Sequence, residues 1–214
     1  MCWSATADLV AGTAVASVGV ACVARVRRPA DLPLAALPLL LGAHQLVEAR
    51  VWHVGGGTGP ATVAWTVIAL PLLALWVPVA VWCTATPAAR RRVTPLVALG
   101  ALTAAGLAYG IATRPVRAEI RGHTVGYATG LPHPELLVAG YLVATVGSLL
   151  LSGDRWIVGL GALTGAGALV CWTLWRLEFV STWCALAALC SVVVYGWTRA
   201  RRPEGAQETA VRQS

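Results

Sequence analysis

The sequence contains no lysine, and its 16 basic residues are all arginine. Because a retinal Schiff base forms on a lysine amine, this absence excludes a retinal protein. Charged residues are also scarce, at 12% of the chain, whereas about a quarter of the residues in a soluble domain are charged. This scarcity excludes an ordinary soluble domain and places the chain among membrane proteins.

Several patterns that would indicate a particular kind of site are missing. The cysteines form no Cys-x-x-Cys pair and no zinc-finger spacing, and the histidines form no His-x-x-x-His or His-Glu-x-x-His pattern. A Cys-x-x-Cys-His motif is also absent, so only non-covalent haem could be bound. No basic region precedes the first apolar run, so we expect that run to be retained as a membrane span rather than cleaved as a signal peptide.

Apolar runs of membrane-spanning length recur along the whole chain. They predict an all-α integral membrane bundle of seven transmembrane helices in one domain, residues 1–202, followed by a disordered cytoplasmic tail, residues 203–214. The predicted spans cover residues 7–24, 32–53, 61–83, 94–112, 135–151, 156–174 and 176–199. Pro71 and Pro78 fall inside the third span and predict a kink there. The longest polar segment, residues 113–134, separates the fourth and fifth spans.

The net charge of +7 comes from arginines that cluster between the apolar runs. This arrangement favours a topological signal over a nucleic-acid surface, because positive charge gathers on the cytoplasmic side of membrane proteins. With the N-terminus outside, the cytoplasmic side collects Arg25, Arg27, Arg28, Arg90, Arg91, Arg92, Arg155, Arg199, Arg201 and Arg202. We therefore expect an outside N-terminus and a cytoplasmic C-terminus in a bacterial inner membrane, with the lipid bilayer as partner and no nucleic acid.

The second span carries polar groups deep in the membrane. His44, Glu48 and Trp52 follow at intervals of four residues, so they share one helix face. Counted from the end of the span, Glu48 lies about 9 Å deep and His44 about 15 Å deep. Ionisable groups at such depth usually face other helices or a wet cavity and mark a functional site. The alternative is structural, with His44 hydrogen-bonded in the core and Glu48 paired with Arg176 or another arginine; Arg50 lies about 200° round the helix from Glu48.

The predicted topology brings further polar residues to the outer end of the bundle. The first span begins there, the second ends there, the polar segment lies there, and the seventh begins there. Candidate residues at this end are Cys2, Asp8, Glu48, Trp52, His53, His123, Tyr127, His133, Arg176, Glu178, Ser181 and Cys184. The ten tryptophans lie largely near span ends, as an interfacial belt predicts.

The opening Met1-Cys2-Trp3-Ser4-Ala5 resembles the Met-Cys-Phe-Ser-Ala start of a family of small, uncharacterised bacterial multi-pass membrane proteins. Gln45-x-x-Glu48-x-x-x-Trp52 and Glu178-Phe179-Val180-Ser181-x-Trp183-Cys184 are similar to motifs of the same family. The resemblance implies a seven-helix architecture with an interior polar site. It implies no reaction.

Two kinds of chemistry are open at the outer end. His53, His123 and His133 are candidate ligands of a transition metal, with Glu48 or Glu178 as an oxygen ligand or general base; the alternative is that they are loop histidines without a role. Cys2, once Met1 is removed, offers an α-amine and a thiol that can chelate a metal or act as a nucleophile. A disulfide with Cys184 is a further alternative.

These residues suggest an outward-facing polar pocket that binds a small molecule, a lipid or a metal. Cys2, Glu48 and Glu178 are the candidate catalytic residues, and the candidate ligand-binding residues are His44, Trp52, Tyr127, Arg176, Ser181 and Cys184. A membrane-embedded, metal-dependent hydrolase acting on a lipid or amide is one alternative. A non-catalytic transport, sensing or accessory protein is the other. The sequence does not determine the oligomeric state.

Overall fold

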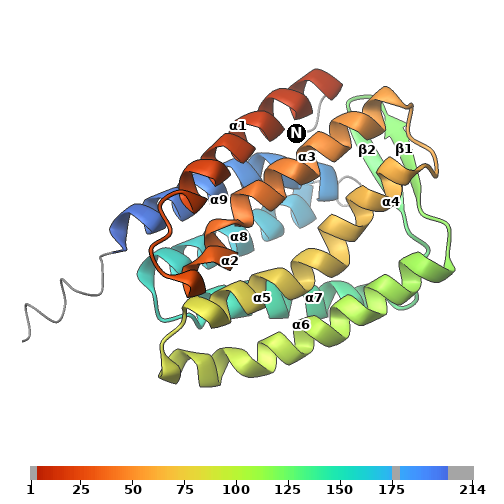
Figure 1. Ribbon diagram of the computed structural model, residues 1–214. Helices are drawn as coiled ribbons and strands as arrows, with labels where there is room; N and C mark the ends of the chain where they lie inside the picture. The colour runs from red at the N-terminus through yellow and green to blue at the C-terminus, as the bar shows by residue number, and fades with distance from the viewer. Residues whose placement is uncertain (1–3, 175–178, 202–214) are drawn as a thin grey trace, which may run out of the picture.

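The computed structural model describes residues 4–174 and 179–201, with side chains described for residues 4–170 and 186–201. Figure 1 shows a bundle of long helices with a small β-hairpin at one end. In chain order the elements are α1 (Ala5–Val23), η1 (Pro29–Asp31), α2 (Leu32–Ala35), α3 (Leu37–His53), α4 (Pro60–Val67), η2 (Ile68–Leu72), α5 (Leu73–Thr84), α6 (Pro87–Thr113), β1 (Arg117–Arg121), β2 (Thr124–Ala128), α7 (Pro134–Leu150), α8 (Arg155–Leu174) and α9 (Phe179–Ala200).

The helices fit a membrane environment. By length and composition, four helical segments are able to cross a membrane: Ala5–Val23, Pro29–His53, Pro60–Thr84 and Pro87–Thr113. Within the described residues, three further apolar helices are shorter: Pro134–Leu150, Arg155–Val170 and Leu186–Ala200. Each of the seven predicted spans therefore corresponds to an apolar helical segment.

The third predicted span contains an irregular turn at its first proline. Residues Ile68–Leu72 form a π-helix with Pro71 inside it, between α4 and α5. Proline has no N–H to donate, and its ring clashes with the carbonyl four residues earlier, so the regular α-helical ladder cannot continue through it. The distortion expected at Pro71 is thus present, whereas Pro78 lies within the continuous helix α5.

The fourth helix begins earlier than the sequence predicted. Helix α6 starts at Pro87 instead of Thr94, with the Thr86 side chain accepting a hydrogen bond from the Ala89 N–H at 3.4 Å. A threonine N-cap followed by proline is a favourable helix start. The sequence places the arginine run between two apolar spans, but arginine is a good helix former, so the helix extends through it. Arg90 donates to the carbonyls of Trp82 and Cys83, at 3.1 Å and 3.0 Å, where α5 ends.

Helices α1 and α3 pack with their backbones in close contact. A Cβ atom added at Gly42 would lie 2.6 Å from the Ala16 nitrogen, and one added at Gly19 would lie 2.5 Å from the Leu39 nitrogen. Small residues at such positions let two membrane helices approach closely. The two helices run antiparallel, with Gly12 against Leu46, so Asp8 near the start of α1 lies level with the end of α3.

The polar segment between α6 and α7 is not a loop, and the fold is therefore not purely α-helical. Strands β1 and β2 form an antiparallel hairpin in which Arg117 pairs with Ala128 and Arg121 pairs with Thr124. Gly122, with a φ of 61°, occupies the turn. The alternation of polar and apolar residues on both sides of this glycine is typical of a hairpin, but the charge of the segment obscured it.

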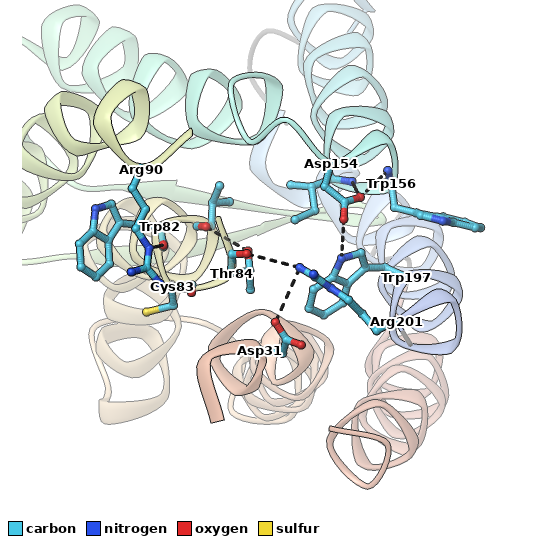
Figure 2. Close-up of polar contacts among 11 residues, drawn as sticks. Asp31, Trp82, Cys83, Thr84, Arg90, Asp154, Trp156, Trp197 and Arg201 are labelled. Atoms are coloured by element: carbon cyan, nitrogen blue, oxygen red, sulfur yellow. Dashed lines mark hydrogen bonds and ion pairs between the residues drawn. The ribbon is translucent and has the colours of Figure 1, made fainter. Parts of the chain in front are cut away.

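A second polar cluster lies at the opposite end of the bundle from the hairpin, and we call this end the Arg201 end. Figure 2 shows Arg201 between Asp31 and Thr84, with Trp197 and Asp154 beside it. The Arg201 guanidinium lies 3.7 Å from the Asp31 carboxylate and donates to the Thr84 carbonyl at 3.4 Å. The Trp197 indole N–H donates to the Asp154 carboxylate at 3.3 Å, and Asp154 also accepts from the Trp156 backbone N–H at 2.9 Å. These contacts join four separate segments of the chain at one end.

Candidate functional site

The last three turns of α3 carry the polar face predicted from the sequence, and the structure buries it. Glu48 is 0% exposed, Gln45 is 1% exposed and His44 is 8% exposed. Trp52 is half-buried one turn beyond Glu48. These residues lie on the side of α3 that faces the bundle and the hairpin, whereas Arg50 is exposed on the other side. Glu48 and Arg50 therefore lie on different sides of α3, although they are close in sequence.

The Glu48 carboxylate is hydrogen-bonded to a residue of the next helix. The indole N–H of Trp65 in α4 donates to Glu48 Oε2 at 2.9 Å. Both side chains are buried, with Trp65 1% exposed. A buried carboxylate is costly unless it is hydrogen-bonded or paired, and in this low-dielectric surrounding each such bond is strong.

Trp65 also contacts two further aromatic rings of the site. The ring of His44 lies 4.6 Å from the Trp65 ring, between centroids, at an interplanar angle of 38°. The ring of Tyr127 in β2 stacks on Trp65 at 3.5 Å and 3°. One indole therefore connects α3, α4 and the hairpin, and we call His44, Gln45, Glu48, Trp65 and Tyr127 the Glu48 cluster.

Two polar atoms on the same face of α3, one turn before and one turn after Glu48, are buried without a hydrogen bond in the part of the chain that the structure describes. They are His44 Nε2 and Trp52 Nε1. Most buried polar atoms in native proteins have a partner from the protein or from ordered water. Leaving a buried polar atom without a partner costs about 1–3 kcal/mol. Packing alone therefore does not explain why these two nitrogens are buried.

The hairpin covers this end of the bundle. Val51 and Trp65 pack with Ala118 and Val125 of the two strands in one hydrophobic cluster. The loop after α3 joins the same sheet, because the Gly57 N–H donates to the Ala118 carbonyl at 2.8 Å and the Ala118 N–H donates to the Gly57 carbonyl at 2.9 Å. Three consecutive glycines make this possible: Gly55, Gly56 and Gly57 all have positive φ, at 76°, 78° and 86°. We call this end the hairpin end.

The three histidines predicted as metal ligands are not buried with the cluster. His53, His123 and His133 are all exposed. His133 lies 3.8 Å from Glu135, and it precedes α7 with a φ of 46°. Among the described residues, no group of three or more histidines, cysteines, aspartates or glutamates is placed to hold a metal ion. The prediction of a metal site on these histidines is therefore not supported, because they lie exposed at three different places: the end of α3, the hairpin turn and the start of α7.

Other predicted site residues have different outcomes. His44, Glu48, Trp52 and Tyr127 come together at the hairpin end, and Asp8 is buried at 1% exposure. Cys2, Arg176 and Glu178 lie outside the described residues, and Ser181 and Cys184 lie in α9 where side chains are not described.

On the exposed side of the hairpin, the Arg121 guanidinium donates to the Glu119 carboxylate at 2.8 Å and lowers the pKa of that carboxyl group.

The contribution of α4 to the site was not predicted from the sequence. Trp65 lies near the start of its span and was assigned to an interfacial belt, yet its ring is buried and its N–H meets a carboxylate. Trp197 is buried at 2% exposure in the same way at the Arg201 end. Thr62 and Thr66 flank Trp65 on the buried face of α4, each with 0% exposure. Hydroxyl residues spaced four apart around a tryptophan were a readable signal, because they mark one polar face on an otherwise apolar helix.

Comparison with known proteins identifies a family but no activity. The model of a family of unknown function (DUF6629) matches residues 1–209 of the chain. Neither a curated protein nor a solved structure matches it. The match agrees with the resemblance to an uncharacterised family, and it covers both the Glu48 cluster and the Arg201 end.

Proposed function

We propose that this protein, which belongs to that family of unknown function, is a seven-span membrane protein that binds a small polar molecule at the Glu48 cluster. The observation that carries the proposal is the buried His44 Nε2, which has no hydrogen bond in the described structure although the His44 ring packs on Trp65, the donor to Glu48. A bound molecule with a hydrogen-bonding group would satisfy this nitrogen. The stacked pair of Trp65 and Tyr127 lies next to this histidine, and apolar walls with a few polar groups are typical of small-molecule sites.

The seven spans are argued from the helices and the positions of the arginines. The three shorter apolar segments belong to α7, α8 and α9, which have 17, 20 and 22 residues. A tilted or straight span needs about 17–25 residues. The Arg201 end carries the arginine-rich turns, and the hairpin end carries fewer arginines, so the positive-inside rule favours the Arg201 end as cytoplasmic. The Glu48 cluster would then face outward.

Reporter fusions test this topology. Green fluorescent protein fused after Ser214 should be fluorescent, because it folds only in the cytoplasm. Alkaline phosphatase inserted between Gly122 and His123, in the hairpin turn, should be active because it matures only outside. In a third fusion, alkaline phosphatase is placed after Ser214 and should be inactive. Activity of this fusion would contradict the seven-span topology.

Ligand binding is tested on the full chain extracted in polymer nanodiscs, so that the native surroundings of the cluster are kept. Denaturing the unaltered protein should release a small molecule, and mass spectrometry should detect about one such molecule per chain. His44→Leu removes the buried nitrogen at similar volume and should abolish this molecule. His123→Leu changes an exposed histidine in the hairpin turn and should leave it bound.

Each outcome has a definite meaning. A molecule that is present in both variants would place its site elsewhere. A well-folded protein that releases no molecule would make the Glu48 cluster structural, as in a non-catalytic accessory protein. Elemental analysis of the same samples tests whether the bound species is a metal. A metal held at the Glu48 cluster should be absent from the His44→Leu variant. No described residue favours the metal-dependent hydrolase, and we propose no reaction.

A further inference from the structure

A groove of about 730 Å³ lies on the surface between the end of α3 and the start of α4. Leu46 and Val47 of α3 form one wall, and Pro60, Ala61 and Ala64 of α4 form the other. Its mouth is open at Gly59, where an added Cβ would meet no atom within 4 Å. Leu46 and Arg50 lie about 200° round α3 from Glu48, and no residue of the Glu48 cluster lines the groove, so it is separate from the site described above.

Arg50 is the single charged residue among those lining the groove. Its side chain is exposed, and within the described part of the chain no carboxylate lies within 4 Å of it. It is three residues before the end of α3, about 4.5 Å along the axis. An arginine stem lies along apolar surface while its guanidinium reaches the polar headgroup level. The groove is therefore apolar along its length and cationic near its mouth.

We infer that this groove binds an anionic phospholipid, with an acyl chain between α3 and α4 and the phosphate at Arg50. The inference rests on the proposed membrane topology, which brings the ends of these helices to the headgroup region. The apolar walls match an acyl chain, and the guanidinium forms bidentate hydrogen bonds with phosphate. A helix from another protein would fit less well, because it would bury Arg50 and would need its own carboxylate at that level.

The test uses the full chain in detergent, with phosphatidylglycerol and phosphatidylcholine of identical acyl chains added at equal concentration. Native mass spectrometry counts the lipids that stay bound. We expect phosphatidylglycerol to bind about fivefold better, the factor that one arginine near an anionic surface supplies. Arg50→Gln should remove this preference. Arg117→Gln, which removes an exposed arginine of β1 outside the groove, should keep it.

A second variant tests the groove without changing charge. Ala64→Phe fills the space between the walls and should reduce the binding of both lipids while the preference between them remains. It also keeps the inference testable if Arg50→Gln does not fold. Equal binding of the two lipids, or a preference that survives Arg50→Gln, would overturn the inference. So would displacement of phosphatidylglycerol by millimolar inorganic phosphate, because the site would then recognise free phosphate. If the reporter fusions still agree with seven spans, such a failure concerns the lipid site alone.

Discussion

At the scale of single residues, the direction of a side chain decides its role. Trp65 and Trp82 both lie near the ends of helical segments and both donate an indole hydrogen bond. The Trp65 bond goes to buried Glu48 at 2.9 Å, whereas the Trp82 bond goes to the exposed hydroxyl of Thr94 at 3.2 Å. Hydrogen bonds to a charged or buried partner contribute more than exposed ones. The two tryptophans therefore form a matched pair for experiment.

Trp65→Phe should lower the free energy of unfolding in detergent by about 1–3 kcal/mol, because it leaves the Glu48 carboxylate without this donor. Trp82→Phe should change it by less than about 0.5 kcal/mol. Thermal unfolding followed by tryptophan fluorescence gives both values. Since Phe is also smaller than Trp, a double-mutant cycle with Glu48→Met, which removes the acceptor oxygens, isolates the hydrogen bond. Strictly additive effects in that cycle would show that the bond contributes nothing.

At the scale of elements, the site depends on how closely the helices approach. Helix α3 places its polar face towards α4 and the hairpin, and α1 packs closely against it through glycines. Gly12, Gly19 and Gly42 are all buried at this contact. Without side chains there, dispersion contacts extend along both backbones and hold α3 in a fixed rotation.

Gly42→Ala should therefore destabilise the protein by about 1–3 kcal/mol, the usual effect of overpacking. The added Cβ would lie 2.6 Å from the Ala16 nitrogen and 2.8 Å from the Gly12 carbonyl oxygen, so the two backbones must separate. Gly159→Ala is the control, because Gly159 lies inside α8 and an added Cβ there meets no atom within 4 Å. Comparing the two unfolding temperatures measures the effect, and equal values would contradict the close packing of α1 on α3.

At the scale of the whole molecule, each end is held together by contacts between segments that are far apart in sequence. The hairpin end is joined by the pairing of Gly57 with Ala118 and by the stacking of Trp65 on Tyr127. The Arg201 end is joined by contacts of Arg201 with Asp31 and with the Thr84 carbonyl. Arg201 also lies over the Trp197 ring at 4.8 Å. The helices between the two ends are largely apolar, so these polar contacts help to determine which helices lie next to each other.

Arg201→Gln should lower the unfolding temperature more than Arg199→Gln, although both remove one positive charge from the same end. Arg201 is partly buried against Asp31, whereas Arg199 is exposed and lies 6.0 Å from the Tyr195 ring. Because partly buried ion pairs are screened less than exposed ones, we expect about 1–2 kcal/mol for Arg201 and less than about 0.5 kcal/mol for Arg199. The reverse order would show that Arg201 does not hold this end together.

The apolar helical segments and the polar face of α3 can be predicted from the order of the residues. Hydrophobic length is a local property, and the spacing of His44, Glu48 and Trp52 follows from helical geometry alone. The sequence also predicts the distortion at Pro71, because a missing N–H acts within one turn.

The partners of His44, Glu48 and Trp52 follow from packing and cannot be predicted from the residue order. Trp65 and Tyr127 come to Glu48 from α4 and β2, and no local pattern states which helix packs against which. His123 and His133 of the polar segment were expected at the site, but both are exposed, because His123 lies in the hairpin turn and His133 directly before α7. Composition and periodicity act along the chain, whereas the site is made by the approach of separate elements, and only packing determines that approach.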